Sequence, residues 1–475
     1  MKRSSQFFWY IFLGLFAAGL FVGVFTKPFL TLLILCFCVG IWLLSHYLHF
    51  GVLVLVGLAP MIGWQVSLTR IRPFLEDYSW IANINAPAVD FWGIALLVAF
   101  GIFFIRSWLE GKTSRLRLPG FLWYGLFLVT ALLSLTKLPS EEFFGGIKYL
   151  FRFVVFAYAV YVFPAVNILS RKTLWERCLR VLFGVGVFAA IMGVVSLFRG
   201  VWMEWGFVRA VPFDIFGWAP FGYQHILLAE VLIGALPIGF YFASRETHKH
   251  KKRWLIAATL LILIIDLLTL SRAAWLTLFV AATVFVFVTY KKQEVTSWFQ
   301  SLRWMFVPLA ALVIYTGVFF VVHPSVSSST HARAMMTEIS LDLFTRSPII
   351  GHGVGSFVSR LGDVELFRLE FGDPLDAHGV VQKIAVEQGL LGLVTFFGFL
   401  FFIFRRLLQR AFETRHHETH HDVVLALFLF GMAWFFQIFN TQYYASTVWI
   451  PTMLALVQLR NLKREGESSG FIDNG

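Results

Sequence analysis

Charged residues are scarce in this chain of 475 residues: 14% are Asp, Glu, Lys or Arg, whereas 58% are hydrophobic. A soluble domain carries about 25% charged residues, so the composition excludes a chain whose whole surface faces water. Cysteine is almost lacking. Cys36, Cys38 and Cys178 are the three cysteines, and their spacing indicates neither a metal site nor a disulfide framework.

The hydrophobic residues form continuous runs of about 17 to 22 residues, the length of a helix that crosses a hydrocarbon core about 30 Å thick. They lack the two-residue alternation of barrel strands, and a backbone in lipid must satisfy its own polar groups. The sequence therefore predicts an all-α polytopic membrane protein with about 12–14 transmembrane helices, the lower count arising if short links near residues 26, 47 and 270 join neighbouring runs. The expected spans are 7–25, 28–46, 48–66, 88–106, 119–136, 147–167, 179–198, 225–243, 254–270, 271–290, 304–322, 389–405, 422–439 and 443–459.

The basic residues that give the net charge of +12 gather in alternate connections between these runs. Lys and Arg accumulate on the cytoplasmic side of membrane proteins, so we expect these connections and both termini there, and no nucleic-acid partner. The first run, after Met-Lys-Arg, is interpreted as an uncleaved anchor. The opposite side then receives residues 67–87, 199–224 and 323–388.

Segment 323–388 is the longest polar stretch, and its apolar content is too high for a disordered linker. Asp373 followed by Pro374 predicts the start of a helix there, and Gly389 predicts its end. His378 would then lie in the first turns and share a face with Gln382. A neutral imidazole can accept a proton from a hydroxyl near neutral pH, although a hydrogen-bonded structural histidine is the alternative.

Two arginines are candidate anion ligands on the same side. Arg272 lies between two apolar runs, where an arginine at a helix centre costs about 2.5 to 3.5 kcal/mol. Its guanidinium either reaches the lipid headgroups or binds phosphate through its fork of donors. Arg209 lies in 199–224 among aromatic residues typical of an interfacial belt, and could be a second phosphate ligand. Those aromatic residues are Trp202, Trp205, Trp218 and Phe221.

Three further patterns have competing interpretations. The glycines Gly351 and Gly353 either let backbone N–H groups approach a phosphate or form a tight turn. Residues 417–421 fit the zinc-protease pattern HExxH, but no third ligand is evident on that side, so no metal or other cofactor is expected. Asp266 and Glu230 lie within expected spans, and they favour a transporter or lipid flippase as the alternative class.

Three blocks resemble the O-antigen ligase and polymerase superfamily of the bacterial inner membrane. They are residues 271–275 (SRAAW), residues 347–357 (SPIIGHGVGSF), and a stretch from His378 through Glu387 to Leu393. The resemblance covers about 205 to 405. Two departures stand out: Gly379 replaces the usual Asn, and residues 221–225 (FGYQH) replace a Gly-x-x-Asn-Pro-Asn stretch.

The resemblance implies a GT-C-like membrane glycosyltransferase, with N-terminal spans in 1–200, a catalytic region in 201–405 and C-terminal spans in 406–475. It would move a preassembled glycan from undecaprenyl diphosphate by metal-independent inverting displacement. The acceptor would be lipid A–core in a ligase, another lipid-linked repeat in a polymerase, or a protein. The resemblance assigns His378 as base or acceptor-orienting residue and Arg272 and Arg209 as diphosphate ligands. Supporting positions are Gly351, Gly353, Gln382 and Glu387.

Overall fold

The protein is mostly helical in its computed structural model, which describes residues 28–67, 85–112, 116–169, 171–199, 209–289, 324–374, 376–415, 417–440 and 443–468. Among these residues, six helices are long and apolar enough to cross a membrane, or up to seven if one bent pair counts as a single span. The polytopic helical class is thus confirmed. The expected spans 7–25 and 304–322, together with Trp202 and Trp205, lie outside the described residues.

The bent pair comprises α2 (Pro28–His46) and α3 (Leu48–Leu58), whose apolar parts meet at 108°. The expected run 48–66 ends earlier than predicted, because Pro60 cannot continue the helix. Beyond it, β1 (Gln65–Ser67) pairs antiparallel with β2 (Asn85–Pro87).

The helices of the central part begin and end close to the expected spans. Residues 147–167 were expected as one span, and they form the larger part of a continuous helical stretch, Ser140–Ile168, that includes two π-helical segments. The elements are α5 (Ala88–Leu109), α6 (Phe121–Ser134), η3 (Leu135–Lys137), α7 (Ser140–Tyr149), η4 (Leu150–Val155), η5 (Ala157–Val162), α8 (Phe163–Ile168), α9 (Lys172–Phe198), α10 (His225–Arg245), α11 (Lys249–Leu268) and α12 (Arg272–Thr289).

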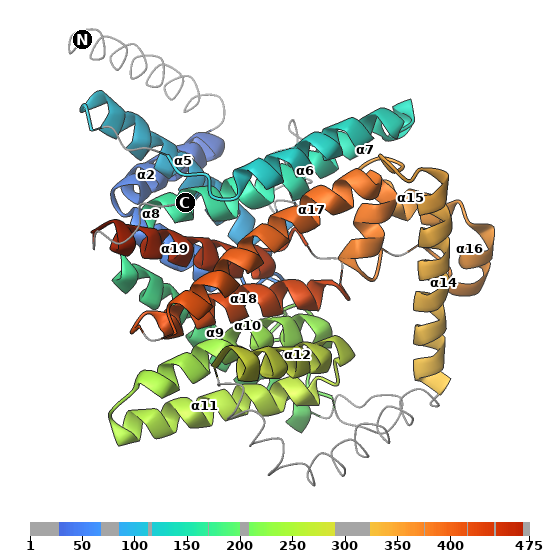
Figure 1. Ribbon diagram of the computed structural model, residues 1–475. Coiled ribbons are helices and arrows are strands. Elements are labelled where there is room, and N and C mark those ends of the chain that lie inside the picture. Colours follow the sequence, from blue (N-terminus) through green and yellow to red (C-terminus); the bar gives the residue numbers. More distant parts are fainter. Residues whose placement is uncertain are drawn as a thin grey trace.

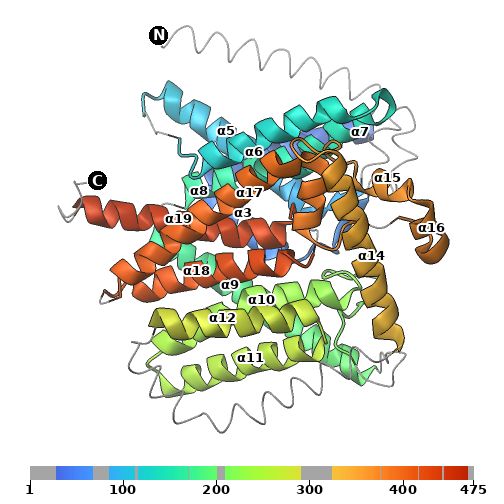
Figure 2. The same ribbon diagram turned by 45° about the vertical axis from the view of Figure 1, so that its right-hand side comes forward.

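The segment expected to be a folded loop holds α14 (Pro324–Arg346), α15 (Phe357–Gly362) and α16 (Glu365–Phe371). Helix α14 runs across one end of the bundle, crossing the direction of α10, α11 and α12 (Figures 1 and 2). This part has a small hydrophobic core of its own, and the expectation of a folded helical segment is therefore confirmed for the described residues. The core comprises Met336, Leu343, Phe357, Leu361, Phe367, Ala377 and Val386.

The chain then returns through α17 (Val380–Glu413), α18 (His420–Gln437) and α19 (Ser446–Ser468). Helix α17 packs against α6 and α18 and passes from the α14 end of the bundle to the opposite end (Figure 2). Its N-terminal end therefore lies beside the folded segment that precedes it.

The predicted helix start at Asp373 is wrong. The helix begins at Val380, after Gly379 in an extended conformation (φ −171°, ψ 139°). Asp376 does not cap a helix, because its carboxylate accepts the N–H of Ala377 and pairs with Lys383. His378 consequently precedes the helix and does not share a helical face with Gln382. The predicted end at Gly389 is confirmed, since its φ of 64° and ψ of −157° interrupt α17.

Candidate functional site

The turn between α11 and α12 carries Arg272 as the first residue of α12. Ser271 precedes it, and the Ser271 Oγ accepts the N–H of Ala274 at 3.4 Å, a contact typical of a helix N-cap. The first N–H groups of a helix and its dipole favour an anion at this end. Arg272 is exposed, so its guanidinium is accessible at the start of α12.

Arg209 is attached to the same turn. Its Nε donates to the carbonyl oxygen of Thr269 at 2.7 Å, and the next N–H, of Ala210, donates to Leu268 at 2.9 Å. Burial, together with the positive charge of Arg272, lowers the pKa of Arg209 to about 10. The two arginines predicted from separate segments therefore lie together.

A third arginine, Arg333, reaches this cluster from α14. Burial lowers its pKa, and the charge of Arg272 lowers it further. Its Nε is buried without a hydrogen-bond partner among the described residues. Sequence reasoning missed Arg333, because an arginine in a polar helix outside the apolar runs looks like an ordinary solvated residue.

His378 is partly buried and lies within electrostatic range of Arg333. Burial lowers its pKa below 6.5, the charge of Arg333 lowers it further, and the carboxylate of Asp376 opposes both. The imidazole is thus neutral at neutral pH, the form that accepts a proton. His225, the first residue of α10, lies within electrostatic range of Arg209 and Arg333. It occupies the stretch 221–225 that departs from the family pattern.

We call Arg209, Arg272, Arg333, His225 and His378 the cationic cluster. Its members come from the segment before α10, from the first residues of α10 and α12, from α14 and from the approach to α17. Burying positive charge is costly unless an opposite charge or hydrogen-bond acceptors compensate it. The arrangement can therefore hold an anion with several oxygens next to a neutral imidazole.

The glycine-rich turn lies in the break of α17. Gly351 and Gly353 have φ values of 78° and 113°. The N–H groups of His352 and Gly353 donate to Val386 and Glu387, at 2.8 and 3.0 Å. The carbonyls of residues 348 and 349 accept the N–H groups of residues 390 and 391. These backbone groups satisfy the helix break, so this geometry matches the tight-turn interpretation and leaves them unavailable to a phosphate.

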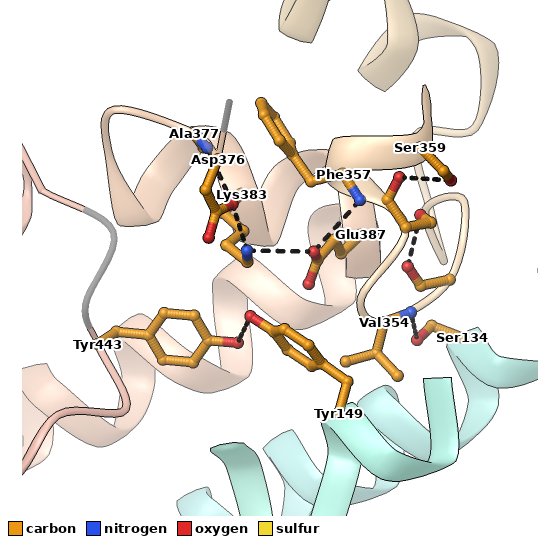
Figure 3. Close-up of polar contacts among 12 residues, drawn as sticks. Ser134, Tyr149, Val354, Phe357, Ser359, Asp376, Ala377, Lys383, Glu387 and Tyr443 are labelled. Carbon is orange, nitrogen blue, oxygen red and sulfur yellow. Dashed lines mark hydrogen bonds and ion pairs between the residues drawn. The ribbon is translucent and has the colours of Figure 1, made fainter. Parts of the chain in front are cut away.

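Gln382 and Glu387 lie on α17, the first partly buried and the second buried. Gln382 Nε2 donates to Thr337 Oγ1 at 2.6 Å and so connects α17 to α14, the helix that carries Arg333. Glu387 is fully buried, and its Oε1 accepts the N–H of Phe357 at 3.4 Å (Figure 3). Gln382 thus links α17 to α14, and Glu387 links α17 to the start of α15.

Gly379, where the family pattern has Asn, packs against the end of α18. A Cβ at this position would lie 2.6 Å from the carbonyl oxygen of Ile438. A side chain here would displace the backbone next to His378, so the departure from the family pattern fits the local packing.

The remaining candidates lie elsewhere. In the part of the chain that the structure describes, no group of three or more His, Cys, Asp or Glu side chains could hold a metal ion. In residues 417–421, His420 begins α18, and its Nδ1 lies 3.1 Å from the carbonyl oxygen of Ala411. Glu230 accepts hydrogen bonds from Gln437 and Thr447, which hold α10 against α18 and α19.

The fold defines a multi-pass helical membrane protein with three arginines and a partly buried histidine gathered at one end of the bundle. Residues 257–397 match the O-antigen ligase family. The matched residues form an O-antigen ligase domain, so the protein is a membrane enzyme that contains such a domain. The match includes Arg272, Arg333 and His378, whereas Arg209 and His225 precede it. No curated protein matches the chain.

Proposed function

We propose that the protein transfers a preassembled glycan from undecaprenyl diphosphate to an acceptor hydroxyl, with lipid A–core as the acceptor. It would thus complete lipopolysaccharide by O-antigen ligation. The convergence of three arginines and His378 at one end of the bundle carries the proposal. The positive-inside bias of the basic residues supports a periplasmic site in the bacterial inner membrane, with both termini in the cytoplasm.

The donor fits the charge of the cluster. When the bond between the sugar C1 and the phosphate oxygen breaks, the leaving diphosphate carries negative charge. Guanidinium groups placed where that charge develops stabilise the transition state more than the ground state. Arg272 at the N-terminus of α12 adds the helix dipole, and Arg209 and Arg333 add two further charges. The chain's own cations thus provide stabilisation that needs no metal ion.

His378 provides the base. Its neutral imidazole accepts the proton of the acceptor hydroxyl while the hydroxyl oxygen forms a bond to C1. The attack occurs on the face of the sugar opposite the diphosphate, so the anomeric configuration is inverted. The proton ends on His378 and the electron pair of the broken bond on the diphosphate.

Deleting the gene for this protein distinguishes the two acceptors, lipid A–core and another lipid-linked repeat. If the protein is the ligase, polysaccharide gels of the deletion strain show lipid A–core without long chains. If it joins lipid-linked repeats, the core carries one repeat. Unchanged polysaccharide together with lost uptake of a small molecule would overturn glycan transfer in favour of a transporter. Purified protein with undecaprenyl-diphosphate glycan and lipid A–core then tests the reaction directly.

A further inference from the structure

A row of three charged residues, two of them buried, adjoins the backbone that carries His378. Lys383 pairs with Asp376, and its Nζ lies 3.7 Å from Glu387 Oε1 (Figure 3). The side chains of Lys383 and Glu387 are 2% and 1% exposed, and that of Asp376 is 36% exposed. Lys383 Nζ also lies 5.1 Å from the centre of the Tyr149 ring. Lys383 is therefore fixed between two carboxylates and an aromatic ring.

Both carboxylates also hold backbone. Asp376 Oδ1 accepts the N–H of Ala377 at 2.9 Å, one residue before His378. Glu387 Oε1 accepts the N–H of Phe357 at the end of the glycine-rich turn. The charged row of Asp376, Lys383 and Glu387 consequently connects the backbone just before His378 with the glycine-rich turn in the break of α17. On the other side, the close contact between Gly379 and Ile438 restrains the same backbone.

Such a row is a poor device for stability alone. Removing Lys383 and Glu387 from water costs several kcal/mol per ion, and the attraction within the row often only offsets that cost. Buried ion pairs are best attested where they fix one arrangement among several. The arrangement fixed here is the backbone that carries His378.

We infer that Lys383 is a positioning residue of the transfer reaction: through Asp376 it holds His378 near the arginines of the cationic cluster. The inference rests on the proposed function. Lys383 does not touch the reacting atoms, and its contribution is the orientation of the imidazole toward the acceptor hydroxyl. A misplacement of about 1 Å can lower a rate about 100-fold.

The row also has an electrostatic consequence for His378. Arg333 from α14 faces His378, and Asp376 opposes it from the histidine's own segment. Behind Asp376 lie Lys383 and Glu387 on α17. Tyr443 and Tyr444 from the connection between α18 and α19 also interact with Asp376. Replacing Asp376 with Asn leaves Arg333 unopposed and lowers the pKa of His378. Replacing Lys383 with Met leaves the Asp376 charge uncompensated and raises the pKa of His378.

The test compares Lys383→Met, Lys383→Arg, Asp376→Asn and the double variant K383M/D376N in the full-length purified protein. The matched control is Lys172→Met, which breaks another ion pair to a buried carboxylate: Lys172 Nζ, on a 41% exposed side chain, lies 2.6 Å from Asp422 Oδ2, and Asp422 is 1% exposed. Asp422 lies in the first turn of α18, and this end of α18 is at the end of the bundle away from α14 (Figure 1). Lys172→Met therefore reports the effect of removing a lysine from a buried carboxylate without touching the site.

We expect Lys383→Met to lower kcat about 100-fold and to leave the donor KM nearly unchanged. Lys383→Arg keeps the positive charge and should retain part of the activity. The acidic limb of the pH–rate profile should move to higher pH in Lys383→Met and to lower pH in Asp376→Asn, and the double variant should lie between them. If the ion pair between Lys383 and Asp376 had only a structural role, replacing its two members would not move the acidic limb in opposite directions.

A second readout is independent of activity. In a background with serine at the three cysteines, His378→Cys is labelled with a membrane-impermeant maleimide, and Lys383→Met should change the labelling rate whereas Lys172→Met should not. The inference is overturned if Lys383→Met keeps kcat and labelling, or if Lys172→Met causes the same loss of kcat. If the wild type transfers glycan while Lys383→Met is unaffected, only this inference fails. If the wild type transfers none, the proposed function fails and the inference with it.

Discussion

Arg209 donates from its Nε to the carbonyl oxygen of Thr269 at 2.7 Å, on the turn that presents Arg272. This hydrogen bond joins a loop before α10 to the connection between α11 and α12. It brings the guanidinium of Arg209 within electrostatic range of Arg272, even though like charges repel. A bound diphosphate would offset the repulsion between the two arginines, so their arrangement is most favourable when the substrate is bound.

Arg272→Ala should lower the rate of glycan transfer about 100- to 1,000-fold, the usual effect of removing one donor from a site of developing negative charge. Arg272→Lys should recover only part of the activity, because an ammonium lacks the planar fork of the guanidinium. Transfer is measured with purified protein and lipid-linked donor. The matched control is Arg253→Ala, an exposed arginine in the first turns of α11 at the other end of the bundle. Equal losses in Arg272→Ala and Arg253→Ala would contradict the site.

Wild-type protein should lose kcat/KM as the pH falls below the usual histidine value, because His378 must be neutral to accept a proton. Burial and Arg333 lower the pKa of His378 below 6.5, so activity persists to a lower pH than an unperturbed histidine allows. His378→Ala should abolish transfer while the protein remains in the membrane. An unchanged acidic limb with substantial residual activity in His378→Ala would remove the base from the mechanism.

Arg333→Gln should lower kcat/KM and also move the acidic limb to higher pH. The sign follows from the charge: Arg333 lowers the pKa of His378, so neutralising Arg333 raises it, and a larger fraction of the enzyme is protonated at a given acidic pH. Arg346→Gln on the same helix, at an exposed arginine paired with Asp342, is the control. A fall in activity without a shift of the limb would mean that Arg333 does not act on His378.

Gly389→Ala should destabilise the protein rather than alter its chemistry. The backbone of residue 389 (φ 64°, ψ −157°) lies in a region open essentially only to glycine, so a side chain there costs about 1 to 3 kcal/mol, and a Cβ would lie 2.6 Å from the backbone of Ile349. Gly234→Ala is the control, since a Cβ there would meet nothing within 4 Å among the described residues. Thermal unfolding in detergent measures both variants. If Gly389→Ala unfolds at the same temperature as Gly234→Ala, the inserted turn does not limit stability.

The bounds of many helices could be predicted because lipid imposes the pattern. The run 28–46 coincides with α2, and 225–243 lies within α10. A hydrocarbon core requires a continuous apolar run of helical length, and this requirement acts on neighbouring residues in sequence. The helix start predicted at Asp373 could not be judged in the same way, because Asp376, three positions after that expected cap, binds Lys383 on α17 instead, a contact that no local pattern reveals.

The candidate site was partly predictable for a related reason. Arg209, Arg272 and His378 were recognisable because each is polar in an unusual place or belongs to a motif, and the structure brings them together. Arg333 and His225 are neither polar residues in an unusual place nor matches to the motif. Each is an ordinary residue in its own segment, and its role depends on the packing of α14 and α10.

The sequence by itself determined that this is a polytopic helical membrane protein and which residues are candidates for its chemistry, since both follow from local composition and motifs. Only the tertiary structure decided that α14 crosses the bundle, that Arg333 and His225 complete the cluster, and that the glycine-rich turn fills the break in α17. These are contacts between residues far apart in the chain. Their energies depend on the fit of whole helices, which no short stretch of sequence specifies.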